Sequence, residues 1–252
     1  MLFLSMLLVG AMIGFVGAGG AGVTIAVLTA GFHVPIHTAL AVALAAMVFT
    51  TLSGAVSHFR EKEVLPKTAL VIGISGVLGA ILGASVSNIM DTRSLHSATS
   101  WMMGLSAFIL YMKLYHAKFL ERLIKPPAKP LDGKKLYILG FITGICNGFL
   151  SAAFGIGAAA FIQITLLLVF GVPLMLSIGT CMAIILPISA SGGLVYLFNG
   201  RLDFMIFIQT LAGLMIGAYI GAKGTHLAPL PILKFFIVAV PATASFVLFL
   251  NS

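Results

Sequence analysis

The chain has 252 residues, of which 60% are hydrophobic and only 8% are charged, and its mean hydropathy is +1.17. A soluble domain carries about 25% charged residues and about 45–50% apolar ones. The composition therefore excludes an ordinary soluble globular protein, a disordered chain and a disulfide-stapled secreted domain. Long unbroken apolar blocks also exclude an outer-membrane barrel, whose strands alternate apolar and polar positions. We expect an all-α, polytopic membrane helix bundle.

The formal net charge of +8 is concentrated in two places, the connecting stretch 117–135 and the neighbourhood of Arg60. The positive-inside rule interprets both as cytoplasmic loops, so the excess charge does not predict a nucleic-acid partner. The two cysteines, Cys146 and Cys181, lie in apolar segments and lack the spacing of a metal site or a disulfide framework. We therefore expect no metal and no cofactor.

About eight apolar blocks follow one another along the chain. A helix needs about 20 apolar residues to cross the hydrocarbon, and most blocks fit one crossing. The first and fifth blocks are longer and carry glycine clusters near their middle, which favours a broken helix or a re-entrant hairpin. No Lys or Arg precedes Arg60, so we interpret the first block as a membrane segment rather than a cleaved signal. The blocks span residues 2–32, 34–58, 67–90, 95–116, 136–170, 173–198, 203–222 and 229–250.

The two halves of the sequence repeat with an offset of 138 residues. Six of the 13 glycines in residues 1–114 coincide with a glycine after this shift, where chance predicts roughly 1.6. Val34-Pro35 likewise coincides with Val172-Pro173. We predict a first membrane repeat at 1–116, a basic cytoplasmic linker at 117–135 and a second membrane repeat at 136–252. Repeats of this kind are parallel or inverted. Charge counting does not separate the two, and the overlong blocks favour the inverted arrangement.

The glycine clusters of the two long blocks are candidate substrate sites. The first cluster matches the letters of a dinucleotide fingerprint but lacks its strand and its acidic residue. Glycine permits unwound backbone at membrane depth, where free N–H groups and half-helix N-termini can bind an anion. The alternative is that the glycines only allow close helix packing. The cluster residues are Gly17, Gly19, Gly20 and Gly22 in the first block, and Gly155 and Gly157 in the fifth.

Glycines four residues apart share a helix face, and for these we favour packing over binding. Examples are Gly79/Gly83 and Gly213/Gly217/Gly221, together with Gly10/Gly14 and Gly140/Gly144/Gly148. Such faces could serve subunit contacts as well as internal ones, so a homodimer stays open.

Polar side chains inside the apolar blocks predict a substrate path, because polar groups at bilayer depth are costly unless they are paired or face water. Thr50, Ser53 and Ser57 form one helical stripe, and Ser191 is the repeat partner of Ser53. Ser189 would join Ser191 in one cavity only if the backbone unwinds at Pro187. The remaining candidates are Asn147, Gln163 and His58, of which His58 could attract an anion or relay a proton.

Gly73-Ile74-Ser75-Gly76 offers a different class of function, because it resembles the nucleophile motif of rhomboid intramembrane serine proteases. That chemistry needs a histidine on a neighbouring helix. His96 and His226 lie near block ends, and the duplicated architecture is foreign to that family. We keep a protease that uses Ser75 as a minor alternative.

The duplicated glycine-rich start, the two V-P pairs, Ser53-Gly54 with Ser191-Gly192, and the His58 stretch into a charged loop resemble the sulfite exporter TauE/SafE family of membrane permeases. The resemblance covers essentially the whole chain. It implies transport of sulfur-containing anions such as sulfite, sulfonates, sulfoacetate or thiosulfate across the bacterial inner membrane.

The distribution of carboxylates agrees with an anionic substrate. Every acidic residue lies at a block end or in a loop, whereas a cation carrier normally has an intramembrane carboxylate. We predict an alternating-access carrier with a midplane site formed by the glycine clusters, Ser53 and Ser191. A passive anion channel would use the same donors and stays open.

Overall fold

The computed structural model describes residues 1–16, 21–116, 127, 130–155, 159–225 and 230–250. Within these residues every element of secondary structure is a helix, which confirms the predicted fold class. The first half contains α1 (Leu2–Val16), α2 (Ala21–Ala26), the π-helix η1 (Val27–Gly31), α3 (Ile36–Arg60), α4 (Pro66–Ile89) and α5 (Thr92–Tyr115). The second half contains α7 (Lys134–Phe154), α8 (Ala159–Ile164), the π-helix η2 (Thr165–Val169), α9 (Leu174–Phe198), α10 (Phe204–Thr225) and α11 (Leu230–Leu250).

The helix bounds follow the 138-residue offset of the sequence. After this shift α2, η1 and α3 coincide with α8, η2 and α9 at both ends, and α4 and α5 begin where α10 and α11 begin. The turn after each π-helix is also the same. Val34 N donates to Leu28 O at 3.0 Å, and Val172 N donates to Leu166 O at 2.9 Å. The two halves of the sequence therefore adopt matching local structure.

In the described residues the second of the two long apolar blocks does not form one continuous helix. In the first block α1 ends at Val16 and α2 begins at Ala21; in the second, α7 ends at Phe154 and α8 begins at Ala159. Gly155, which follows α7, adopts a left-handed conformation with φ of 63° that favours glycine. Each second piece, α2–η1 or α8–η2, has 11 residues and is only about 16 Å long, short of the roughly 30 Å hydrocarbon core. The predicted break is confirmed at Gly155, and in the first block the prediction falls on residues 17–20, which lie outside the described residues.

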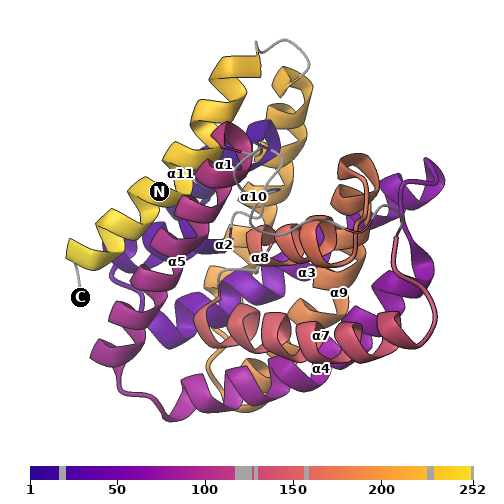
Figure 1. Cartoon of the computed structure of the whole chain (residues 1–252). Helices are drawn as coiled ribbons and strands as arrows, with labels where there is room; N and C mark the ends of the chain where they lie inside the picture. Colours follow the sequence, from indigo (N-terminus) through magenta and orange to yellow (C-terminus); the bar gives the residue numbers. More distant parts are fainter. Residues whose placement is uncertain (17–20, 117–126, 128–129, 156–158, 226–229, 251–252) are drawn as a thin grey trace.

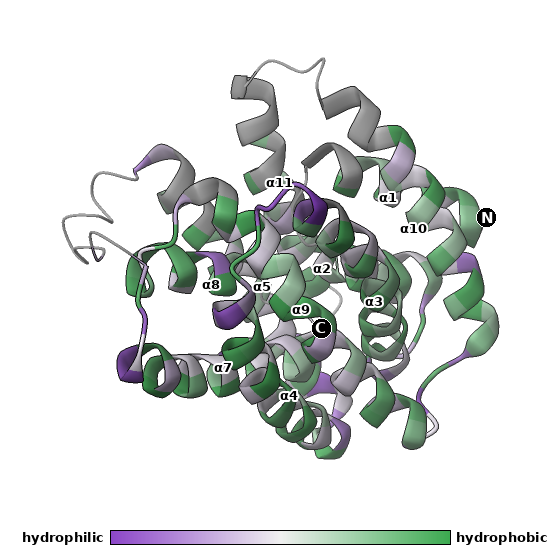
Figure 2. Cartoon of the chain, turned by 90° about the vertical axis from the view of Figure 1, so that its right-hand side faces the viewer, coloured by the Kyte–Doolittle hydropathy of each residue, from purple (hydrophilic) through white to green (hydrophobic). Residues whose placement is uncertain are grey.

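Four helices of the described chain are long and apolar enough to cross a membrane. They are α3, α4, α7 and Leu176–Phe198 within α9. Shorter apolar helices accompany them, including Leu2–Ile13 and Phe204–Ile220. Figure 2 shows the consequence for the surface: the helices are mostly hydrophobic, and hydrophilic segments gather at helix ends and connections. This distribution matches a bundle whose helices lie in lipid.

Helix α7 lies alongside α4 (Figure 1), and the two are in contact through glycine. A Cβ on Gly79 or Gly83 would collide with backbone atoms of Ile145 or Phe149. The same contact recurs between α10 and α1, where a Cβ on Gly217 would collide with the carbonyl oxygen of Leu7. Glycine permits this close backbone approach, which confirms that these spaced glycines serve helix packing.

Helices α3 and α9 pack against each other in opposite directions. Gly54 on α3 meets Met182 on α9, whereas Leu44, ten residues earlier on α3, meets Gly192, ten residues later on α9. The side chains at the first half of α3 are almost all inaccessible and form the centre of the main hydrophobic core. This crossing is therefore the centre of the molecule.

Candidate functional site

The predicted polar stripe on α3 is partly solvent-accessible. Thr50 is half-buried, and its hydroxyl donates to the carbonyl oxygen of Met47 in its own helix at 3.1 Å. Ser53 is exposed. The side chain of Ser57 lies outside the described part of the structure. Ser53 is therefore the residue of this stripe that is most open to a ligand.

The corresponding serines on α9 are less accessible. Ser189 is fully buried and donates to Leu186 O at 3.1 Å, and Ser191 is half-buried and donates to Ile188 O at 2.9 Å. α9 continues as a regular helix through Pro187, so the backbone opening considered at this proline does not occur. On a regular helix residues two apart face different directions. The structure therefore does not bring Ser189 and Ser191 into one cavity.

Ser53 and Ser191 lie at opposite ends of the α3–α9 crossing. Ser53 adjoins the contact of Gly54 with Met182, and Ser191 adjoins the contact of Gly192 with Leu44. These contacts are ten residues apart on α3, about 15 Å at 1.5 Å per residue. The two serines are therefore too far apart along the crossing to hold one small ion together.

The amide candidates lie near the break between α7 and α8. Asn147 is buried, and its Nδ2 donates to Thr143 O at 2.9 Å and to Thr165 Oγ1 at 3.4 Å, which ties α7 to η2. Gln163 is half-buried on α8 and has an interaction partner. Of the predicted glycines, Gly17, Gly19, Gly20 and Gly157 lie outside the described residues.

The two described glycines of the clusters are tightly packed. A Cβ on Gly22 would lie 2.8 Å from Met103 Cε on α5. A Cβ on Gly155 would collide with Leu40 of α3 and lie 2.6 Å from Ile25 Cδ1 of α2. Gly155 therefore requires glycine, both for its left-handed backbone and for close packing, whereas at Gly22 the flexible end of Met103 could move aside.

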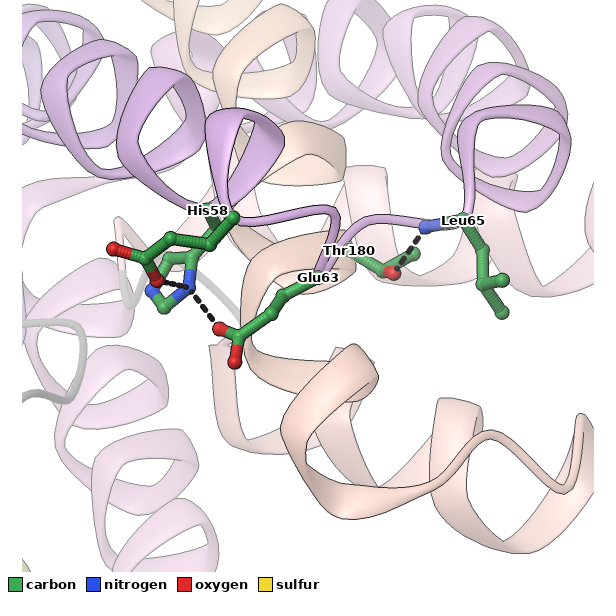
Figure 3. Close-up of polar contacts among 5 residues, drawn as sticks. His58, Glu63, Leu65 and Thr180 are labelled. Carbon is green, nitrogen blue, oxygen red and sulfur yellow. Dashed lines mark hydrogen bonds and ion pairs between the residues drawn. The ribbon is translucent and has the colours of Figure 1, made fainter.

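His58 lies at the end of α3, next to two carboxylates of the turn that follows (Figure 3). Its Nδ1 is 2.8 Å from Glu63 Oε2 and 3.9 Å from Glu61 Oε2. Ligand atoms of the three residues lie within 4.8 Å of one another, a spacing that can hold a metal ion. The short contact with Glu63 gives the imidazole a hydrogen-bond partner without a metal. Sequence reasoning selected His58 and missed both carboxylates as its partners. Glu63 is five residues from His58, and side chains at that spacing meet only where the helix ends.

The turn after His58 is also fixed to the second half of the chain. Leu65 N donates to Thr180 Oγ1 on α9 at 3.0 Å (Figure 3). Gly179 packs against the same turn, since a Cβ there would lie 2.5 Å from Glu63 O and 2.7 Å from His58 Cβ. The environment of His58 is therefore coupled to the position of α9.

Three further hydroxyls could join a polar path. Thr99, Ser151 and Thr210 are buried, and in the described structure their oxygens have no hydrogen-bond partner. Sequence reasoning did not select them, because an isolated Ser or Thr in an apolar helix usually bonds to its own backbone. Buried polar groups without a partner are uncommon and costly, and these three are therefore candidates for water or substrate contact.

Ser75, the nucleophile of the protease alternative, serves packing. Its hydroxyl is within hydrogen-bonding distance of Val71 O and Ile72 O in its own helix and of Gly140 O on α7, at 3.0 Å. These partners are all backbone carbonyls, which accept a hydrogen bond but do not remove the proton of a serine as a general base would. The geometry gives the protease alternative no support.

Two apolar grooves lie on the outer sides of helix pairs. One follows α4 and α7, and the other follows α5 and α11, where Trp101, Phe108 and Phe246 line it. Neither groove is lined by a predicted substrate-binding residue, although Ser75 of the protease alternative lies in the first. Both are suited to acyl chains rather than to a small anion.

A bundle of apolar helices, with carboxylates only in its connections where described, is a multi-pass membrane protein. The family model for "Sulfite exporter TauE/SafE" matches residues 2–248. The chain belongs to this family.

Curated relatives agree with this assignment. The chain is 40% identical over 249 residues to "Probable membrane transporter protein YdhB" of Bacillus subtilis (strain 168), covering 98% of this chain and 99% of that protein. It is 26% identical over 233 residues to "Probable membrane transporter protein YjnA" of the same organism, with 88% and 87% covered. No solved structure matches the chain. The family and the names of the relatives indicate a membrane transporter, not an enzyme.

Proposed function

We propose that this membrane transporter is a secondary carrier that moves a small sulfur-containing anion, such as sulfite, sulfoacetate, another sulfonate or thiosulfate, across the bacterial inner membrane. Membership of the TauE/SafE family supports the substrate class. The inference that the substrate is an anion rests on the position of the acidic residues.

All five described carboxylates lie outside the helices. They belong to turns and connections: Glu61, Glu63, Asp91, Asp132 and Asp203. A carrier for a cation would normally place a carboxylate within the membrane. Hydroxyl and amide groups are the polar groups that these apolar helices offer instead, and such neutral donors bind an oxyanion through several hydrogen bonds.

The proposed transport cycle uses two inverted repeats that rock against each other. The matching helix bounds support the duplication. The antiparallel crossing of α3 and α9 supports inversion, because parallel repeats would place these corresponding helices in the same direction. Reciprocal contacts support a two-fold relation as well: Gly79 meets Ile145 O, and Gly217 meets Leu7 O, at positions that differ by 138 in each case.

The proposed path runs along the α3–α9 crossing, from Ser53 to Ser191. The exposed Ser53 would meet the anion first, and Ser191 would receive it farther along. The glycine-rich breaks near Gly22 and Gly155 flank this path. Because the two serines are about 15 Å apart along the helix axis, the ion would be passed between them rather than held by both.

Proton coupling would use His58 and Glu63. The pair is 2.8 Å apart at the end of α3, close to the start of the path, and can hold one proton between two groups. Replacement of Glu63 by Gln would keep the size of the side chain and remove its charge.

The test is uptake into proteoliposomes of sulfite, thiosulfate, sulfoacetate and sulfate, with and without a pH gradient. The proposal expects accumulation of one sulfur oxyanion above equilibrium when the gradient is present. Flux that only equalises the anion concentration on the two sides would indicate a channel or uniporter instead of a coupled carrier. No flux of any of the four anions would overturn the substrate assignment.

A matched pair of variants tests the path. Ser53→Ala with Ser191→Ala should abolish flux while the protein stays folded, whereas Thr51→Val, which removes a buried hydroxyl bonded to Met47 O in its own helix, should not. Normal flux in the folded double variant would refute the path.

A further inference from the structure

A buried tyrosine joins four helices at one end of the molecule. Tyr196, near the end of α9, is fully buried, and its hydroxyl is 2.7 Å from Ser87 Oγ on α4 and 3.1 Å from Ala152 O on α7. His37 Nε2, at the start of α3, is 3.1 Å from Ser87 O. We call these four residues the Tyr196 junction. It fastens the ends of α4, α7 and α9 to the start of α3.

The corresponding position in the first half is His58, 138 residues earlier. The backbone is the same at both places: Glu63 N donates to His58 O at 2.9 Å, and Arg201 N donates to Tyr196 O at 3.0 Å. The side chains differ, because His58 is only partly buried and bonds to the carboxylates of its own turn. Tyr196 therefore bonds across helices through a buried hydroxyl, whereas the partners of His58 in the described part of the structure lie in its own turn.

The packing of α4 against α9 also differs from that of the corresponding pair, α10 and α3. α4 presents small residues to α9, where a Cβ on Gly73 would lie 3.1 Å from Pro187 Cγ and a Cβ on Gly76 would lie 2.6 Å from Ile188 Cδ1. The corresponding positions on α10 are Leu211 and Leu214. Large side chains keep two helix backbones apart, and α10 accordingly makes far fewer contacts with α3 than α4 makes with α9.

The contacts between α4 and α9 also extend along the whole pair. They run from Leu65 with Thr180 at one end to Ser87 with Tyr196 at the other. In the corresponding pair, α3 and α10, Phe49 meets Phe207 with ring centroids 6.2 Å apart. Ser53, which lies one turn farther along α3, is exposed. The described α4–α9 contacts therefore reach both ends of this pair, whereas Ser53 of α3 is exposed beyond the Phe49–Phe207 contact.

We propose that Tyr196 is a positioning residue that acts as the latch of one gate: its hydroxyl holds the Tyr196 end of the path closed while the His58 end stands open. This inference rests on the proposed alternating-access function. A carrier of that kind must open the two ends in turn, and the contacts that hold the closed end must break in every cycle. Loss of the tyrosine hydroxyl removes the hydrogen bonds to Ser87 and Ala152 but keeps the packed ring, so it favours the state in which this end is open.

The experiment measures thiol accessibility from each side of the membrane in a background without Cys146 and Cys181. Ser53→Cys reports the His58 end, and Ser191→Cys reports the Tyr196 end. Membrane vesicles of both orientations are treated with an impermeant maleimide. With Tyr196 intact, Cys at position 53 should react from the His58 side, and Cys at position 191 should be protected from the Tyr196 side. Tyr196→Phe should raise the labelling rate at position 191 about fivefold to tenfold, the change expected when a hydrogen bond of ordinary strength is lost.

Two further variants keep the result interpretable. Tyr137→Phe removes an exposed hydroxyl from α7 and should leave labelling unchanged. Ser87→Ala removes a partner of Tyr196 and should raise labelling at position 191, and it replaces Tyr196→Phe if that variant does not fold. Labelling at position 191 that is equal in the parent and in folded Tyr196→Phe or Ser87→Ala protein would overturn the latch. Labelling needs no substrate, so a raised rate in a protein that moves none of the tested anions would refute the proposed substrate and leave the latch standing.

Discussion

Gly79→Ala should destabilise the protein by forcing α4 and α7 apart. The new Cβ would collide with Ile145 O and lie 2.8 Å from Ile145 C, and backbone atoms cannot rotate away as a flexible side chain can. Ordinary carbon contacts need roughly 3.5–4.0 Å, so the helices must separate locally by about 1 Å. Overpacking of this kind costs about 1–3 kcal/mol. The gain from replacing glycine by alanine within a helix returns up to about 1 kcal/mol.

The net loss for Gly79→Ala is therefore about 1–2 kcal/mol, or roughly 2–8 °C in the midpoint of thermal unfolding. The assay is a thermal unfolding scan of the detergent-purified protein. Gly31→Ala is the matched control, because a Cβ there would lie 3.8 Å from Val27 Cγ1, an ordinary contact. Gly217→Ala should behave like Gly79→Ala, since its Cβ meets Leu7 O in the same way. A midpoint for Gly79→Ala equal to or above that of the parent protein would refute this reasoning.

Two other predictions concern the connections between helices. Thr180→Val removes the acceptor of the Leu65 N–H and should cost about 1–3 kcal/mol of stability in unfolding scans. Thr51→Val should cost less, because it leaves no backbone donor unpaired. Equal losses in the two variants would contradict this account. Asp91 accepts a hydrogen bond from Ser94 N at the start of α5, and this bond holds the pKa of the Asp91 carboxyl below its ordinary value. Because the folded-state pKa is lowered, the stabilisation is present near neutral pH and disappears as the pH falls through that pKa. The thermal unfolding midpoint of Asp91→Ala should therefore lie below that of the parent at about pH 7 and approach it at about pH 3. A difference between the two midpoints that does not change with pH would exclude the carboxylate as the cause of the difference.

The sequence was sufficient to predict the helical class, the break of the second long block at Gly155 and the use of spaced glycines for packing. These features depend on local composition and on the spacing of residues within one helix. The 138-residue offset found in the glycines also anticipates the helix bounds, because matching residues favour matching local structure.

The tertiary contacts of the polar residues were not predictable in the same way. His58 meets Glu63 only because α3 ends at Arg60 and the chain turns, and Tyr196 meets Ser87 across 109 positions of sequence. Pro187 indicated an opening in α9, yet packing against Gly73 accommodates it within a continuous helix. Which hydroxyl faces a path and which bonds to its own backbone depends on neighbours that a single helix does not reveal.

The pairing of α1 with α10 also constrains the biogenesis of the protein. α1 leaves the ribosome long before α10, because the glycines that it packs against, Gly213 and Gly217, are made about two hundred residues later. Until then the contact face of α1 has no partner within the chain and must be covered by lipid or by the insertion machinery. A chain that ends before α10 would therefore remain incompletely assembled, and the fold can be completed only after the last third of the protein has entered the membrane.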